Sequence, residues 1–344
     1  MAQFSLVAMR SPILLAVPNV SEGRDAETIA RIGIAFAPSS RRGTPLAEAA
    51  AGEAGSEVRL LDVHSDADHH RSVFTLAGRP GELGDALLRG AAVAVAEIDV
   101  VARSLGDRAH AGAHPYVGAI DVVPLVYFDE RARGAACAQA LVVGDRIASE
   151  LDVPVFLYGE LAGGHPGTAR ADFRRGGIAG LARRMAGAGA GAEAPLRPDF
   201  GPPAPDPRAG ATLVAAREPL IAFNLQLRPP ADLDDATRIA GLVREGGEQG
   251  LPGLRAIGVA LGSGVAQVSI NVERPLELPL AEVAAAVSRH APLQSAELVG
   301  LAPRSALEGF PFDLPLVGFD PERHLIENAL SACGLAASVA DEND

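Results

Sequence analysis

The order of strand-like and helix-like segments in the second half of the chain constrains its fold most. Apolar runs typical of strands and a 3.6-residue period typical of helices follow one another in the order βαββαβ. The strands are expected at 219–227, 254–261, 265–272 and 296–303, and the helices at Asp232–Gly246 and 280–290. This order is that of the ferredoxin-like unit, an open sheet with helices on one face.

The first half of the chain repeats this pattern. Strands are expected at 13–20, 58–63, 71–77, 117–128 and 153–159, and helices at 24–36, 80–98 and Glu130–Leu151. We therefore expect an α/β (α+β) fold with two ferredoxin-like subdomains, residues 1–217 and 218–344, the second ending in a tail. Their sheets should face each other across a ligand cleft. Stretches rich in Ala, Gly and Pro predict an insert at 38–56 and a linker between the halves at 186–210.

Composition excludes several classes of protein. A net charge of −13 opposes nucleic-acid binding, because contacts to phosphates supply most of that affinity. The 30 basic residues are all arginine, so no lysine is available as a nucleophile or for a Schiff base. Cys137 and Cys333 have no ligand or disulfide spacing. No apolar run approaches the roughly 20 residues of a membrane helix, and no signal peptide is recognised, so a cytoplasmic protein without a membrane partner is expected.

Histidines gather in two short windows, at 62–70 and 108–121. His114 lies between Ala113 and Pro115, in a Gly-containing loop before a predicted strand. Imidazole is the usual proton carrier near neutral pH, so His114 is a candidate acid–base residue. A loop histidine that only binds backbone is the alternative that the residues alone leave open.

The window 62–70 also holds carboxylates and imidazoles close together, which suggests a metal site. On a strand, however, Asp62 and His64 share one face, whereas residues 65–69 form the turn that follows. We therefore expect a polar turn with one or two ligand-contacting residues and no metal. A metal hydrolase remains an alternative only if this window binds a metal.

Nine motifs, in this order, are similar to those of the glutamate formiminotransferase family, in its stand-alone form without the cyclodeaminase part. They are VPNVSEGRD (17–25), LLDVHSDADHHRSVFTLAG (60–78), HAGAHPYVGAIDVVP (110–124), VPVFLYGE (153–160), PDFGP (198–202), GATLVAAR (210–217), LIAFNLQL (220–227), AQVSINV (266–272) and ELVGLAP (297–303).

The resemblance implies transfer of a formimino group from N-formiminoglutamate to tetrahydrofolate, a co-substrate, in histidine degradation and one-carbon metabolism. It implies a folate tunnel between the subdomains and a homodimer. The catalytic histidine of the family falls on His114. Its folate-binding stretch falls on the end of the predicted linker, namely Gly201, Pro202, Pro203, Ala204, Pro205, Asp206, Pro207, Arg208, Ala209 and Gly210.

Further substrate- or folate-binding candidates within the motifs are Asn19, His64, Arg71 and Tyr116, and carboxylates could also be bound by Arg24, Arg208 and Arg217. Five positions depart from the family pattern: Tyr116 and Val117 replace an arginine and a methionine, Ala111 an arginine, His64 an aspartate and His70 an asparagine. An insertion near 101–107 also precedes the His114 loop. Without the arginine beside His114, a different formimino or formyl donor is an open alternative. A folate-binding protein without turnover is another.

Overall fold

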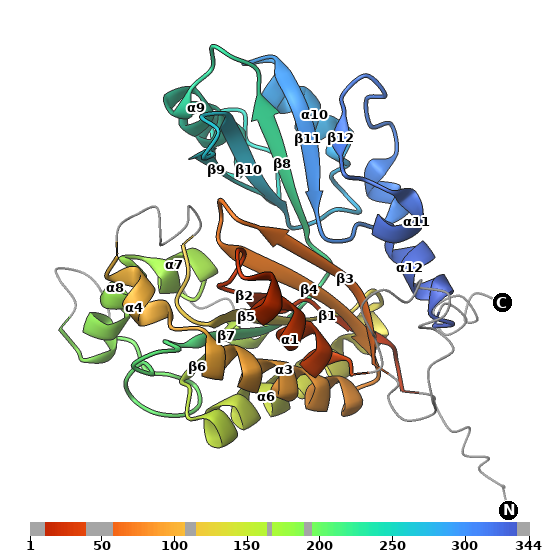
Figure 1. Cartoon of the computed structure of the whole chain (residues 1–344). Helices are drawn as coiled ribbons and strands as arrows, with labels where there is room; N and C mark the ends of the chain where they lie inside the picture. The colour runs from red at the N-terminus through yellow and green to blue at the C-terminus, as the bar shows by residue number, and fades with distance from the viewer. Residues whose placement is uncertain (1–10, 39–57, 107–114, 164–166, 189–194, 336–344) are drawn as a thin grey trace, which may run out of the picture.

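A computed structural model describes residues 11–38, 58–106, 115–163, 167–188 and 195–335. Their strands form two sheets, one of seven strands and one of five (Figure 1). The strands of the first sheet lie between residues 14 and 217, and those of the second between 221 and 317. Each half of the chain therefore builds its own sheet.

The core of the first sheet has the predicted ferredoxin-like order β3–β4–β1/β2–β5. Its elements are β1 (Leu14–Ala16), β2 (Asn19–Val20), α1 (Ala26–Phe36), β3 (Arg59–Asp66), β4 (Arg71–Gly78), α3 (Glu82–Glu97), α4 (Val100–Ser104) and β5 (Ile120–Val126). The strand expected at 13–20 is divided into β1 and β2. Pro18 lies at the break, where a proline cannot donate a ladder hydrogen bond.

The first sheet is then extended by two parallel strands. The added elements are α6 (Glu130–Leu151), β6 (Val155–Gly159), η1 (Glu160–Ala162), α7 (Arg170–Arg174), α8 (Gly177–Met185) and β7 (Thr212–Arg217). β7 pairs with both β5 and β6 and so lies between them. The prediction that 186–210 links the two halves is therefore wrong. This segment leads back into the first sheet, because the apolar run 212–216 is buried as a central parallel strand.

The second half confirms the predicted βαββαβ order. It contains β8 (Ile221–Leu227), α9 (Leu233–Val243), β9 (Leu254–Ala260), β10 (Ala266–Val272), α10 (Leu280–Ser288), β11 (Leu293–Val299), η2 (Arg304–Leu307) and β12 (Leu316–Val317). The sheet order is β12–β11–β8–β10–β9. β12 is a short parallel addition beside β11 that the sequence pattern did not predict.

Helices α1, α3 and α6 cover the outer face of the first sheet, α9 and α10 cover that of the second, and the inner faces lie opposite each other, as expected (Figure 1). Helices α7 and α8 pack on the inner face of the first sheet, against β6 and β7. α1, α3 and α6 pack on the first sheet through one apolar cluster, and α9 and α10 pack on the second through another. None of the helices in the described part of the chain is both long enough and apolar enough to span a membrane.

The end of the described chain returns to the first sheet. After α11 (Pro321–His324), α12 (Ile326–Ala332) buries Ile326, Ala329 and Leu330 in a cluster with Leu15 and other residues of the first sheet. The C-terminal segment therefore connects the two halves at one end of the gap between the sheets.

Candidate functional site

A cavity of about 650 Å³ lies between the two sheets. Side chains of a strand point alternately to its two faces, and on β4 and β5 alternate residues line the cavity. The first sheet contributes, among others, Leu15, Asn19, His64, Asp66, Arg71, Val73, Thr75, Val122, Pro124 and Val126, and the second contributes Ala222, Asn224, Ile257, Ser269, Asn271 and Val299. The site is therefore built by both halves of the chain.

Arginines dominate one part of the cavity wall, although the chain as a whole is acidic. Those that line it among the described residues are Arg71, Arg170, Arg174, Arg217, Arg244 and Arg255. Burial and the nearby guanidinium of Arg174 lower the pKa of Arg71 to about 9. Burial and Arg170 lower the pKa of Arg217 to about 10. Both remain protonated at neutral pH, and clustered cations at this depth favour an anionic ligand.

Buried acceptors hold two of these arginines in place. Arg174 forms an ion pair with Asp121, whose other oxygen accepts the backbone N–H of Val117 at 2.8 Å. Arg71 donates to Oδ1 of Asn19, while Nδ2 of Asn19 donates to the carbonyl of Val17 at 2.8 Å. These bonds fix the guanidinium groups at the cavity wall. Less side-chain conformational entropy would therefore be lost when a ligand binds.

A third arginine reaches across the gap. Arg170 of α7 lies over the ring of Tyr158, 5.9 Å from its centroid, and its Nη2 is 4.0 Å from Oε1 of Glu273, which follows β10 of the second sheet. Glu273 also accepts from Nε of Arg255 at 3.3 Å. A second cross-sheet contact joins Nε2 of His64 to Oε1 of Glu297 at 3.7 Å.

The second half lines the cavity with neutral polar side chains as well as charged ones. Asn224 of β8 and Ser269 and Asn271 of β10 face the cavity from the second sheet, and Nδ2 of Asn224 donates to Glu297 at 3.0 Å. Arg244, Glu245, Arg255 and Glu273 of the same half also line the cavity. The guanidinium groups suit carboxylates, and the amide and hydroxyl groups suit neutral groups that donate and accept hydrogen bonds.

Comparison with known proteins assigns this architecture to a family. A family model described as the formiminotransferase domain, N-terminal subdomain, matches residues 13–217. The chain belongs to the formiminotransferase family. It is 31% identical over 325 residues to a glutamate formimidoyltransferase of Streptococcus pyogenes serotype M1, covering 92% of this chain and 98% of the relative. The same name belongs to a protein of Thermoplasma acidophilum that is 30% identical over 322 residues, covering 91% of this chain and 96% of the relative.

Longer members of the formiminotransferase family match as well. The formimidoyltransferase-cyclodeaminase of Sus scrofa is 36% identical over 313 residues, which cover 86% of this chain and 51% of the relative. The chain therefore spans about half the length of that bifunctional relative, and almost the full length of the two glutamate formimidoyltransferases.

Four of the predicted site residues line the cavity of this formiminotransferase, namely Asn19, His64, Arg71 and Arg217. Tyr116 does not. Its ring packs against the core of the first half, and its hydroxyl is buried in a small recess beside Asn19 and Arg71. His114 lies outside the described residues, and Pro115, the residue that follows it, lines the cavity.

The predicted folate-binding stretch Gly201–Gly210 does not line the cavity. At its end, Gly210 has a φ of +75°, and an added Cβ would lie 2.2 Å from the carbonyl oxygen of Val117, so only glycine fits this close approach. Arg208 is exposed, and its Nε lies 3.4 Å from Oδ2 of Asp99, the residue before α4. Arg24 does not line the cavity either, and its Nε donates to the carbonyl of Ala67 at 2.9 Å. Contact between this stretch and folate remains a prediction.

Several cavity residues were not predicted. Arg170 and Arg174 are four residues apart, which places them on one face of α7, and this spacing is a signal that the sequence contains. Ser269 and Asn271 alternate with buried Val268, Ile270 and Val272 in an otherwise apolar strand. That alternation predicts a polar inner face once the strand is placed opposite another sheet.

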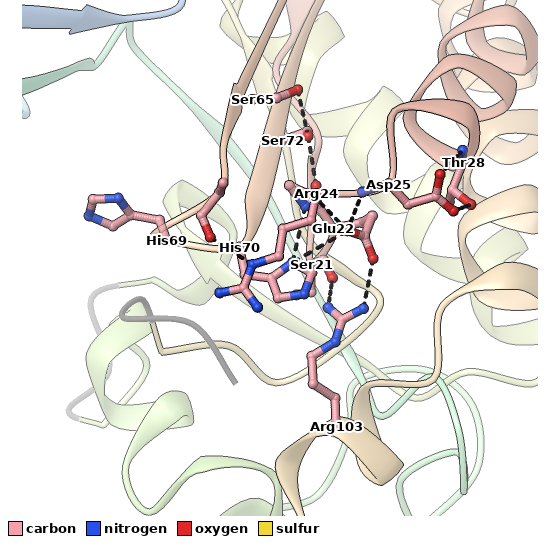
Figure 2. Close-up of polar contacts among 12 residues, drawn as sticks. Ser21, Glu22, Arg24, Asp25, Thr28, Ser65, His69, His70, Ser72 and Arg103 are labelled. Atoms are coloured by element: carbon pink, nitrogen blue, oxygen red, sulfur yellow. Dashed lines mark hydrogen bonds and ion pairs between the residues drawn. The ribbon is translucent and has the colours of Figure 1, made fainter. Parts of the chain in front are cut away.

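The window 62–70 consists of the end of β3, which runs to Asp66, and a turn at 67–70. The prediction that the turn begins at residue 65 is wrong, because Ser65 and Asp66 pair with β4. The two histidines of this turn point to different sides. His69 lines the cavity, whereas His70 turns toward Glu22 on another side, where its Nδ1 accepts the N–H of Gly23 at 3.1 Å (Figure 2). Within the described ranges, no three His, Cys, Asp or Glu side chains converge in a way that could hold a metal ion.

Proposed function

We propose that this chain transfers the formimino group of N-formiminoglutamate to tetrahydrofolate, forming 5-formiminotetrahydrofolate and glutamate. The observation that carries the proposal is the cavity of this formiminotransferase, which combines clustered arginines with the neutral polar side chains of Asn224, Ser269 and Asn271. Both substrates carry carboxylates, and folate also carries a ring with neutral donors and acceptors. A volume of about 650 Å³ falls within the range for small-molecule sites.

The chemistry requires little more than alignment and proton transfer. A formimino group on an amine is an amidinium near neutral pH, so its carbon is already electrophilic. N5 of tetrahydrofolate loses a proton as it attacks, and the departing glutamate nitrogen gains one. In the simplest scheme, His114 takes the first proton and returns it to the leaving nitrogen, which typically contributes about 10²- to 10⁴-fold.

Arginines of the first half supply the charge that carboxylate binding needs. Arg71 and Arg174 are held at the wall by Asn19 and Asp121, and Arg170 and Arg217 extend the positive region. These four guanidiniums favour a dicarboxylic donor even though Tyr116 replaces the family arginine. They therefore support N-formiminoglutamate over the alternative donors, and the names of the relatives favour catalysis over folate storage.

We further propose a cytoplasmic homodimer that acts in histidine degradation and one-carbon metabolism, with subdomains 1–217 and 218–344. The net charge of −13 supports small-molecule substrates over nucleic acid.

An assay of released glutamate tests the function directly. It combines the purified chain with tetrahydrofolate and N-formiminoglutamate. Turnover should require both substrates. N-formiminoglycine, which lacks the side-chain carboxylate, should have a KM at least tenfold higher, because it loses a charge-assisted contact. Folate binding without turnover would instead support a storage protein, and turnover with another donor alone would reject the proposed donor.

His114→Ala should lower kcat at least about a hundredfold and leave the thermal midpoint nearly unchanged, because a loop acid–base residue stabilises the transition state and little of the core. Full activity of this variant would remove His114 from the mechanism. A fall in activity that accompanies a fall in the midpoint would indicate a structural histidine.

A further inference from the structure

A second histidine, held by a carboxylate, lies at the wall of the same cavity. Nδ1 of His69 is 2.6 Å from Oδ2 of Asp66, and both residues line the cavity. The other oxygen of Asp66 accepts the backbone N–H groups of Asp68 at 2.8 Å and of His69 at 2.9 Å. These three bonds fix the imidazole relative to β3, and only 5% of His69 is exposed.

The charge of Asp66 decides which nitrogen of His69 is basic. Burial opposes ionisation of Asp66, but the hydrogen bonds from the side chain and backbone of His69 outweigh it and lower the pKa of Asp66 to about 2. An ionised carboxylate only accepts hydrogen bonds, so Nδ1 of His69 carries a hydrogen. In the neutral ring, Nε2 is therefore the nitrogen that can take up a proton.

The surroundings of His69 are those of the anion-binding part of the cavity. His69 also borders the small recess formed with Asn19, Arg71, Tyr116 and Asp121. The other charged or titratable side chains that border this recess are Arg71 of β4, Asp121 of β5, Tyr116 and His70, and Asp66 of β3 is bonded to His69 directly. A substrate carboxylate on Arg71 would place the rest of the substrate beside the imidazole.

We propose that His69, oriented by Asp66, is a second proton-transfer residue of the reaction. This inference rests on the proposed function. As the bond from N5 of tetrahydrofolate to the formimino carbon forms, neutral His69 accepts the N5 proton. As the bond from that carbon to the glutamate nitrogen breaks, His114 donates a proton to the leaving nitrogen. One proton is taken up and one is released, and exchange with solvent restores both histidines.

The neighbouring histidine provides a matched control. His70 has a φ of 52°, and asparagine tolerates this left-handed conformation better than most residues. Nδ1 of His70 accepts from the N–H of Gly23 and lies 3.4 Å from Oε1 of Glu22, whereas the side chain of His69 points away from His70 and Glu22 (Figure 2). His70→Asn removes one imidazole from the same turn without touching the Asp66–His69 pair, and should keep kcat within about twofold.

The test compares His69→Ala, Asp66→Asn and His70→Asn in steady-state assays from pH 5 to pH 9. His69→Ala should lower kcat at least about a hundredfold with KM values within about threefold, and added imidazole should restore part of the rate. It should also change the dependence of kcat on pH, because one proton-transfer group is removed. Asp66→Asn should lower kcat at least tenfold, because an amide can hold the ring in the wrong tautomer.

Circular dichroism and thermal unfolding show whether each variant folds. Folded His69→Ala with wild-type kcat and pH profile overturns the inference and leaves the proposed function intact. A loss of activity that imidazole does not restore, together with a lowered thermal midpoint, assigns His69 a structural role and also overturns it. Wild-type chain without any transfer activity would reject the proposed function and this step with it.

Discussion

At the scale of single residues, the site depends on charged side chains that short contacts hold beside their partners. Asp66 is the clearest case, because hydrogen bonds from His69 hold its pKa at about 2, below the usual value for an aspartate. A depressed folded-state pKa stabilises the protein above the unfolded-state pKa, and this stability is lost as the pH falls through the folded-state value. This contribution to the free energy of unfolding should therefore be lost between about pH 5 and pH 2.

Asp66→Asn should accordingly lower the free energy of unfolding by about 2 kcal/mol at neutral pH, and the difference from wild type should shrink toward zero as the pH falls to about 2. Urea unfolding at a series of pH values measures this difference in the free energy of unfolding. Asp68→Asn, at an exposed position of the same turn, is the control and should stay within about 0.5 kcal/mol of wild type at each pH. A difference that stays constant with pH would contradict the assignment.

At the scale of elements, the return of α12 to the first sheet joins the two halves through apolar burial. Leu330 is 4% exposed in a cluster with Leu15 and Leu61, on the open face of the first sheet. Leu330→Ala removes buried methyl groups and leaves a cavity, so it should lower the free energy of unfolding by about 2–4 kcal/mol in urea titrations. Leu141→Ala on α6 makes the same change at a residue 40% exposed and should cost less than about 1 kcal/mol.

Equal effects of these two substitutions would mean that α12 does not stay packed on the sheet in solution. In that case the cavity would lose one end of its wall, since Ile326 of α12 also lines it.

At the scale of the whole molecule, a ligand in the cavity contacts both sheets and should stabilise both halves together. At a concentration 100 times its Kd, such a ligand raises the free energy of unfolding by about 2.7 kcal/mol. Thermal unfolding with added 5-formyltetrahydrofolate, a stable folate, should therefore show one transition that moves upward as a unit. Two transitions, of which only one moves, would show that folate binds to a single half.

Local elements and the class of fold could be predicted from the amino-acid pattern alone. Hydrophobic periodicity over 130–151 predicted α6 with the observed bounds, because a helix buries one face within a single segment. The alternation of strands and helices predicted both ferredoxin-like units, and the motifs, taken together, carried the resemblance to formiminotransferases.

Which segments meet in space could not be predicted in this way. The insertion of β7 between β5 and β6 follows from pairings between residues far apart in the chain, which a local period cannot specify. For the same reason, Arg170 and Arg174 became cavity residues only when α7 was placed beside β5 and β6. Tyr116, adjacent in sequence to the predicted site, lies in a recess beside the cavity. Side-chain direction within a strand is local, but what the side chain faces depends on the opposite sheet.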